Sequence, residues 1–365
     1  MGVVFFIGAV NIILGLISYL YYRINFTWGR EPAFLLTYIF AGASALISRL
    51  PWLELPTSMD KFLAWSGNMW VALAYYTTLW SLLHLVIYLL GKTGLFTVNS
   101  YALAKTGLLL ICGFLVWGVY RAFTPVIRTE NIVTAKLPPS ADYKIVLLTD
   151  IHLGKILGRA YAEKMTERVN ALHPDIVLIS GDMLDEKLPY VARENSLSPL
   201  RELRTAKGVY MAYGNHDYLD RPGKWQQMLE HNGITVLRNQ DVIIDGKLKI
   251  TGVEDYSFEA SDFAIRALSD GNEYFYNLLL DHQPRRMETA ADYGYDLYLS
   301  GHTHTGQLFP NRIFTRRMYS LDYGRKNYGA MTAITSNGYG FWGPPVRTEA
   351  APEIVVINLK GEGSL

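Results

Sequence analysis

Cysteine is almost absent from this chain of 365 residues, which contains only Cys112. A single cysteine excludes an internal disulfide, so cysteine usage does not indicate an oxidising or a reducing compartment. Cys112 stands in an apolar segment, where we expect a small buried hydrophobic side chain. The net charge is also small, with a formal value of +1 at pH 7. This balance argues against a general nucleic-acid binder, and we expect no specific nucleic-acid partner.

Charged residues are scarce in the first third of the chain. Residues 1–120 contain six Lys or Arg and three Asp or Glu, whereas the other 245 residues contain 28 and 30. Four apolar stretches cover 2–22, 33–49, 62–90 and 101–119. Each is near the roughly 20 residues that a helix needs to cross a bilayer. Residues 1–10 carry no Lys or Arg and three more apolar stretches follow, which argues against a signal peptide. We therefore predict a four-helix transmembrane domain over residues 1–120, with the lipid bilayer as its partner.

Four spans would place the N-terminus and the C-terminal domain on the same side of the membrane. The Lys and Arg residues beside the spans usually decide which side that is. Here the two faces carry equal numbers, with Arg23, Arg30, Lys92 and Lys105 on one and Arg49, Lys61, Arg121 and Arg128 on the other. Within the spans, we expect His84, Asn11 and Asn68 to form hydrogen bonds between helices.

Apolar runs alternate with helical patterns in the last two-thirds of the chain. A charged, proline-containing segment at 121–142 reads as a linker or as a strand that leads into the next domain. Runs suited to buried strands then cover 143–149, 174–180, 208–214, 276–280 and 296–300, with helical periodicity at 158–172 and 284–294. This alternation predicts an α/β domain with a largely parallel sheet over residues 143–365.

Side chains that bind metals follow each of these five runs. The candidate ligands are Asp150, His152, Asp182, Asn215, His282, His302 and His304. One such loop alone could be an ordinary turn or a helix cap. Because ligands bind at the carboxyl ends of strands in open α/β sheets, five loops of this kind favour one convergent site.

Oxygen and imidazole ligands without cysteine suit Mn, Fe or Zn. Seven ligands are too many for one ion with an open position, so we predict two divalent ions that share a carboxylate. Such a pair binds a phosphoryl oxygen and converts a bridging water to hydroxide during in-line displacement. His216 is then a surplus imidazole that could donate a proton to the leaving oxygen. Asp217 is expected to hold the tautomer of His216.

Five motifs in order resemble those of the calcineurin-like metallophosphoesterase superfamily. They are Asp-Ile-His at 150–152, Gly-Asp at 181–182, Gly-Asn-His-Asp at 214–217, a lone histidine at 282 and Gly-His-Thr-His at 301–304. The resemblance runs from about residue 143 to the C-terminus, and the preceding apolar stretches are similar in layout to the membrane-anchored bacterial branch. It implies a four-layer sandwich of two mixed sheets flanked by helices.

The resemblance also divides the ligands between two metals. Asp150, His152, Asp182 and His304 would hold one ion, and Asp182, Asn215, His282 and His302 would hold the other. His216 matches the catalytic histidine of the family. His302 and His304 would therefore serve different ions.

These observations lead us to expect a membrane-anchored phosphoric ester hydrolase. A metal-bridging hydroxide would attack a phosphodiester or pyrophosphate bond of a lipid, lipid-linked or other cell-envelope substrate. A pyrophosphohydrolase of a nucleotide-linked acylated sugar, of the UDP-diacylglucosamine type, is the alternative enzyme. A non-catalytic metal-binding membrane scaffold or sensor is the alternative of another class, although a scaffold would not need His216.

Two further expectations concern substrate contact and location. The segment "GYGFWGPPVR" at 338–347 either caps the fold or forms a rim over the metals, with Arg347 reaching a substrate phosphate. We expect a multi-pass protein of the cell membrane, and the family resemblance favours the extracytoplasmic side for the catalytic domain.

Overall fold

The computed structural model of the chain describes residues 2–48, 50, 55–185, 188–218, 222–269 and 273–363. Arg49, one of the basic residues counted above, lies outside these ranges. The chain divides into two compact units. Met1–Tyr120 and Gly343–Val346 form one, and Arg121–Trp342 and Arg347–Leu365 form the other.

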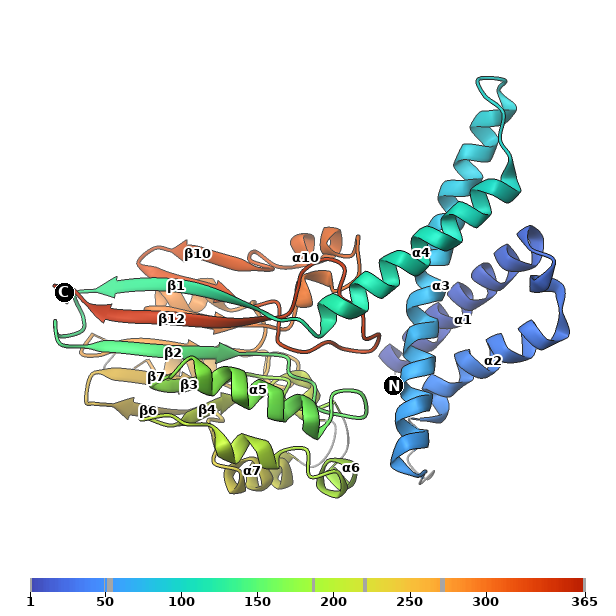
Figure 1. The fold of residues 1–365 in the computed structure, drawn as a ribbon. Helices are drawn as coiled ribbons and strands as arrows, with labels where there is room; N and C mark the ends of the chain where they lie inside the picture. The colour runs from blue at the N-terminus through green and yellow to red at the C-terminus, as the bar shows by residue number, and fades with distance from the viewer. Residues whose placement is uncertain are drawn as a thin grey trace. The chain divides into compact units, whose positions relative to one another are not determined.

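Helices make up the first unit (Figure 1). They are α1 (Gly2–Asn25), the 3₁₀ turn η1 (Trp28–Arg30), α2 (Pro32–Ile47), α3 (Thr57–Lys92) and α4 (Ser100–Ala122). Among the described residues, only α3 and α4 are long and apolar enough to cross a membrane.

This result corrects the expected four-helix transmembrane domain to two candidate spans. The 16 residues of α2 extend about 24 Å at 1.5 Å per residue, less than the hydrocarbon core of about 30 Å.

Polar side chains connect the helices of this unit. Tyr21 Oη on α1 lies 2.9 Å from His84 Nδ1 on α3, so the expected bond between helices is confirmed for His84. Asn68 instead donates to the carbonyl of Ala64, one turn earlier in its own helix, at 2.7 Å. Cys112 is exposed on α4, so the expectation that it is buried was wrong. An outward-facing apolar helix surface explains the difference, because hydropathy alone does not distinguish it from a buried one.

Two six-stranded sheets form the centre of the second unit. The first has the order β1-β12-β2-β3-β4-β5 and comprises β1 (Val126–Thr134), β2 (Asp142–Leu148), β3 (Ile176–Ser180), β4 (Val209–Ala212), β5 (Thr235–Val236) and β12 (Glu353–Gly361). The second has the order β10-β11-β9-β8-β7-β6 and comprises β6 (Gln240–Ile244), β7 (Leu248–Gly252), β8 (Tyr276–Leu280), β9 (Leu297–Ser300), β10 (Gly324–Tyr328) and β11 (Met331–Thr335). Both sheets contain parallel and antiparallel pairs, which confirms two mixed sheets.

Short helices accompany the strands. They are α5 (Arg159–Ala171), α6 (Leu188–Arg193), α7 (Pro222–His231), α8 (Phe263–Ala267), α9 (Met287–Asp292) and α10 (Arg312–Met318), with 3₁₀ turns η2 (Ser198–Glu202), η3 (Asn215–Tyr218) and η4 (His304–Gly306). The expected helices at 158–172 and 284–294 correspond to α5 and α9.

Alternation along β2 shows how the layers pack. Ile145 and Leu147 belong to the core between the two sheets, together with Leu278 of β8. Val146 and Leu148 point to the opposite face and pack in the cluster that includes residues of α5 and α7, because successive side chains of a strand face opposite sides. A third cluster joins the outer face of the second sheet to α8 and α9. The second unit thus has helices on the outer face of each sheet.

The pairing of β2 with β3, β3 with β4, and β8 with β9 is parallel. Within each sheet the carboxyl ends of these strands therefore meet at one edge. The expected ligand loops follow these ends.

Candidate metal centre

Two buried aspartates define the middle of the site. Asp150 follows β2 and Asp182 follows β3, and their exposed fractions are 0% and 2%. Both have positive φ angles, 51° and 53°, which non-glycine residues adopt at an energetic cost that often accompanies functional sites. The carboxylate of Asp150 accepts the backbone N–H of His302, and Asp182 Oδ1 accepts that of His216 at 2.8 Å. Backbone donors from distant loops thus fix both carboxylates.

Glycines allow the loops to approach these carboxylates. A Cβ atom on Gly214 would collide with Asp182 Oδ1, and one on Gly301 would collide with Asp150 Oδ2. The glycines that precede Asn215 and His302 are therefore required by the close packing of the loops.

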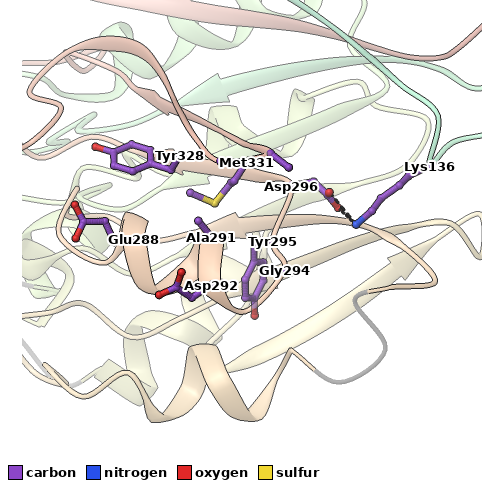
Figure 2. Close-up of a pocket in the computed structure, with 11 residues that line it drawn as sticks. Lys136, Glu288, Ala291, Asp292, Gly294, Tyr295, Asp296, Tyr328 and Met331 are labelled. Carbon is purple, nitrogen blue, oxygen red and sulfur yellow. Dashed lines mark hydrogen bonds and ion pairs between the residues drawn. The ribbon is translucent and has the colours of Figure 1, made fainter.

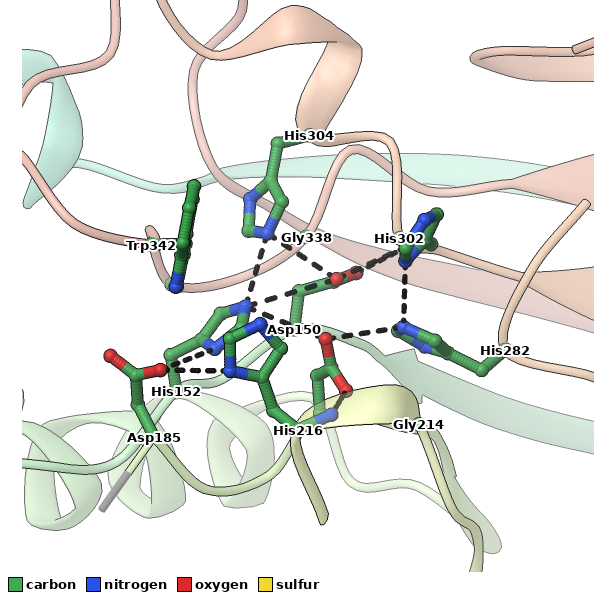
Figure 3. Close-up of polar contacts among 12 residues, drawn as sticks. Asp150, His152, Asp185, Gly214, His216, His282, His302, His304, Gly338 and Trp342 are labelled. Atoms are coloured by element: carbon green, nitrogen blue, oxygen red, sulfur yellow. Dashed lines mark hydrogen bonds and ion pairs between the residues drawn. The ribbon is translucent and has the colours of Figure 1, made fainter. Parts of the chain in front are cut away.

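One group of ligand atoms surrounds Asp150. His152 Nε2 and His304 Nε2 face each other at 3.1 Å, and His304 Nε2 lies 3.4 Å from Asp150 Oδ1 (Figure 3). His152 Nε2 is also 3.8 Å from Asp182 Oδ2. Candidate ligand atoms of Asp150, His152 and His304 all lie within 4.8 Å of one another.

A second group surrounds the other side of Asp182. His282 Nε2 lies 3.2 Å from Asp182 Oδ2 and 3.2 Å from His302 Nδ1. The other ring nitrogen of His282 lies 2.8 Å from the carbonyl oxygen of Ser180, a contact that orients the ring by donating from Nδ1. Asp182, His282 and His302 form a second cluster within 4.8 Å, so Asp182 borders both groups.

The donor set fits divalent metal ions. Imidazole nitrogens that face each other beside carboxylates suit a shared cation, because such ligands bind metals in their deprotonated forms. Asn215 Oδ1 is buried and has no hydrogen-bond partner among the described residues, so this oxygen is also available as a ligand. Six of the seven expected ligands thus lie in the two clusters, and Asn215 contributes an unpartnered oxygen in the loop after β4.

The electrostatics of the site favour neutral imidazoles at two ligand positions. Burial, assisted by the nearby charge of His282, lowers the pKa of His302 to about 3. Burial likewise holds the pKa of His304 well below its usual value. Burial opposes ionisation of Asp182, but the charges of His282 and His216 outweigh it and hold the pKa of this carboxyl well below its usual range.

His216 has a carboxylate partner that the sequence did not identify. Its Nδ1 atom lies 2.9 Å from Asp185 Oδ1. Its ring packs edge-on against His152, with centroids 4.9 Å apart, and lies 5.9 Å from the ring of Trp342 (Figure 3). Burial disfavours the charged form of His216, but Asp182 and Asp185 raise its pKa to about 9. The two carboxylates therefore hold the imidazole in place and favour its protonated form.

Asp217 does not fill the expected role beside His216. Its Oδ2 atom accepts the backbone N–H groups of Asp182 and Gly214 at 2.8 Å, and its Oδ1 atom accepts that of Met183 at 3.1 Å. The carboxylate therefore joins the β3 and β4 loops. We correct its role from orienting the His216 ring to fixing the backbone around Asp182.

Arg347 is also placed differently from the expectation. Its side chain is fully buried, and Nη1 donates to the carbonyl of His304 at 3.1 Å. Its Nη2 atom lies 2.7 to 3.1 Å from the carbonyls of Asn337, Gly338 and Gly340. Because both terminal nitrogens bind backbone carbonyls, we replace the expected substrate contact with a structural role under the His304 loop.

A surface depression of about 430 Å³ has none of these residues in its lining, which Figure 2 draws. Lys136 and Asp296 form an ion pair of 2.8 Å at its wall, and Asp296 immediately precedes β9. Met331, the first residue of β11, lines it too. It thus lies at the amino ends of these strands, whereas the candidate ligands follow carboxyl ends.

Comparisons with known proteins agree with the site. Residues 143–306 match the family model described as calcineurin-like phosphoesterase. An uncharacterised metallophosphoesterase of Campylobacter jejuni is 32% identical, over 80% of this chain and 79% of the relative. One from Helicobacter pylori is 33% identical, over 69% and 68%.

A relative from Danio rerio is named a transmembrane protein with metallophosphoesterase domain. It is 32% identical over 73% of this chain and 64% of its own length. Together with the two apolar helices α3 and α4, this similarity indicates membrane association.

The matched motifs, the clustered ligands and the named relatives agree on a hydrolase of phosphate esters that uses divalent metals. The chain belongs to the calcineurin-like metallophosphoesterases.

Proposed function

We propose that this chain is a membrane-anchored phosphoesterase with two divalent metal ions, Mn, Fe or Zn, in its site. The observation that carries the proposal is the position of Asp182, which borders both histidine clusters. A carboxylate shared in this way suits a pair of ions.

In this proposal, seven side chains hold the metals. Asp150, His152 and His304 with Asp182 bind the first ion, and Asn215, His282 and His302 with Asp182 bind the second. When bound, the two ions supply Lewis acidity for the phosphoryl oxygens and activate a water for in-line attack.

His216 acts as the proton donor to the leaving oxygen. Asp185 engages Nδ1, so Nε2 is the ring nitrogen left to exchange a proton with substrate. The carboxylate of Asp185, beside Nδ1, favours the protonated form of the ring. Asp217 supports the reaction indirectly, because it fixes the backbone on either side of Asp182.

We propose a phosphodiester or pyrophosphate of a lipid or cell-envelope molecule as substrate. The support comes from α10, which begins six residues after η4 and, within its seven described residues, buries no side chain. Ile313, Phe314 and Met318 are 51 to 59% exposed on this helix, and Arg316 and Arg317 lie in its last turn. Exposed apolar side chains with neighbouring arginines suit the interface of a bilayer that contains anionic lipids.

Helix α10 is also connected to the metal-binding loop. Arg312 and Thr315 bond to the carboxylate of Asp322 at 3.1 and 3.0 Å. Thr303, between His302 and His304, donates to the Asp322 carbonyl. A lipid bound along α10 would therefore contact a helix that is hydrogen-bonded, through Asp322, to the loop that carries His302 and His304. We expect Phe314→Ser to lower turnover of a lipid phosphodiester in vesicles while leaving that of bis-p-nitrophenyl phosphate unchanged.

For the organisation of the chain, we propose a multi-pass membrane region within 1–120, a connecting segment at 121–142 and a catalytic domain at 143–365. We place the catalytic domain on the extracytoplasmic side of the cell membrane. Protease treatment of sealed, right-side-out vesicles should then cleave the catalytic domain. Complete protection there, with cleavage in inverted vesicles, would place it in the cytoplasm.

Turnover by the purified full chain with Mn²⁺ and bis-p-nitrophenyl phosphate tests the proposal. Removing a general acid usually lowers the rate about 10²- to 10⁴-fold, so His216→Ala should do so while both metals stay bound. His231→Ala, at the exposed end of α7, is the matched control and should behave as wild type. A wild-type chain that binds both metals but hydrolyses no phosphate ester, envelope lipids included, would instead be a scaffold.

A further inference from the structure

Two neighbouring arginines after His282 have different environments. Arg286 is buried and forms a bidentate pair with Asp281, with both N–O distances 2.8 Å. Arg285 is exposed, and it forms no ion pair with a carboxylate in the part of the chain that the structure describes. Arg286 is therefore structural, whereas no carboxylate among the described residues neutralises the charge of Arg285.

The guanidinium of Arg285 is nevertheless held in one place. Its Nε donates to Gln283 Oε1 at 3.1 Å, and its Nη2 donates to Tyr319 Oη at 3.2 Å. It also lies over the rings of Tyr319 and Tyr256, 4.7 and 5.3 Å from their centroids. Aromatic faces and neutral oxygen atoms stabilise the cation without cancelling its charge.

The buried side chain of Gln283 explains why this position is rigid. Its amide nitrogen donates to both carboxylate oxygens of Asp255 at 3.0 and 3.1 Å and to Ser257 Oγ at 2.7 Å. Because the nitrogen is engaged there, the amide oxygen turns toward Arg285. Gln283 and Asp255 are 3% and 0% exposed, so the residues that position Arg285 are buried.

This cation lies beside the second metal cluster. The ring of Tyr319, which is itself 8% exposed, packs edge-on against that of His302 with centroids 5.9 Å apart. Of the five N–H donors of a guanidinium, Gln283 and Tyr319 use two, which leaves three for a ligand.

We propose that Arg285, supported by Tyr319 and Gln283, binds a second phosphate group of the substrate beside the phosphate that the metals hold. An arginine with free donors, preorganised by aromatic rings, matches the planar arrangement of phosphate oxygens. The preferred substrate class is then a pyrophosphate diester rather than an isolated phosphodiester. This inference rests on the proposed phosphoesterase function.

Kinetics with two substrates on the full chain tests the inference. The substrates are di(4-nitrophenyl) diphosphate, which has two phosphates, and bis-p-nitrophenyl phosphate, which has one. Hydrogen bonds to charged groups contribute enough that their loss should raise KM about 10- to 100-fold. Arg285→Gln should raise KM by this factor for the diphosphate. Its KM for bis-p-nitrophenyl phosphate should stay within about twofold of the wild-type value. Arg285→Lys keeps the charge but loses the planar set of donors, so its KM for the diphosphate should lie between those of the wild type and Arg285→Gln.

Two controls separate the possible failures. Arg266→Gln removes the same charge from an exposed position on α8 and should leave both substrates unaffected. If Arg285→Gln changes KM equally for both substrates, or changes it for neither, the second-phosphate site is overturned. Turnover of bis-p-nitrophenyl phosphate by the wild type would still support the proposed phosphoesterase in that case. Absence of turnover with both substrates in the wild type would instead contradict the proposed function itself.

Discussion

Asp185 Oδ1 lies 2.9 Å from His216 Nδ1 and 3.8 Å from His152 Nδ1. One carboxylate thus faces both a candidate metal ligand and the candidate proton donor. The arrangement leaves the Nε2 atoms of the two rings for the metal and the substrate.

Replacing Asp185 tests this arrangement. Asp185→Asn removes the negative charge that orients His216, so kcat should fall about 10- to 100-fold, as for other residues that support a ligand or a catalytic side chain. The fall should be measured with bis-p-nitrophenyl phosphate at saturating Mn²⁺. Asp292→Asn, at an exposed position of α9, should change nothing. A wild-type kcat in Asp185→Asn would show that Asp185 does not support His216.

Gly214 allows the β4 loop to approach Asp182. A methyl group at this position would collide with Asp182 Oδ1, so Gly214→Ala should displace the shared carboxylate and weaken metal binding about 10- to 100-fold. Gly223→Ala is the matched control, because a Cβ on Gly223 meets nothing within 4 Å. Isothermal titration with Mn²⁺ measures both variants, and equal affinities would show that the loop tolerates the added atom.

Arg347 should contribute to stability and not to substrate binding. Arg347→Met leaves four backbone carbonyls near the site without their donor, which should lower the free energy of unfolding of the second unit by about 2 to 4 kcal/mol. KM for bis-p-nitrophenyl phosphate should stay within about twofold in the fraction that remains folded. Denaturant unfolding measures the first effect, and a selective rise in KM without loss of stability would restore the substrate contact.

His302 and His304 should serve different metal ions. His304 Nε2 belongs to the cluster of Asp150 and His152, whereas His302 lies with Asp182 and His282. His302→Ala and His304→Ala should therefore each lower the affinity for one ion and largely retain the other, as resolved by stepwise Mn²⁺ titration. The same binding step lost in both variants would indicate that the two histidines chelate one ion.

The clustering of the candidate ligands could be predicted from the sequence because it depends on a general property of parallel sheets. Residues directly after β2, β3 and β4 must lie near one another once these strands pair in parallel. The same reasoning applies to His282 and His302, which follow β8 and β9.

The partners of individual side chains could not be predicted in this way. Asp217 adjoins His216 in the sequence, yet in the turn η3 its carboxylate meets the backbone N–H groups of Asp182 and Met183. Asp185 follows Asp182 by three residues in an irregular loop, where no periodicity indicates which way a side chain points. The burial of Arg347 likewise depends on the carbonyl of His304, 43 residues earlier in the chain, together with that of Gly340 in its own segment.

Only two of the four expected spans are candidates in the described residues, for a related reason. Hydropathy identifies apolar stretches, but it does not fix where a helix begins and ends. Helix α2 ends at Ile47 after 16 residues, and only α3 and α4 combine sufficient length and hydropathy among the described residues.

The central claim is that two metal ions share Asp182 and together support hydrolysis. It is tested most directly by removing metals from the purified full chain with a chelator and titrating Mn²⁺ back, while metal content and turnover of bis-p-nitrophenyl phosphate are followed together. Turnover should be absent without metal, and activity should saturate at two bound ions per chain. Full activity at one bound ion, or turnover by the metal-free chain, would contradict it.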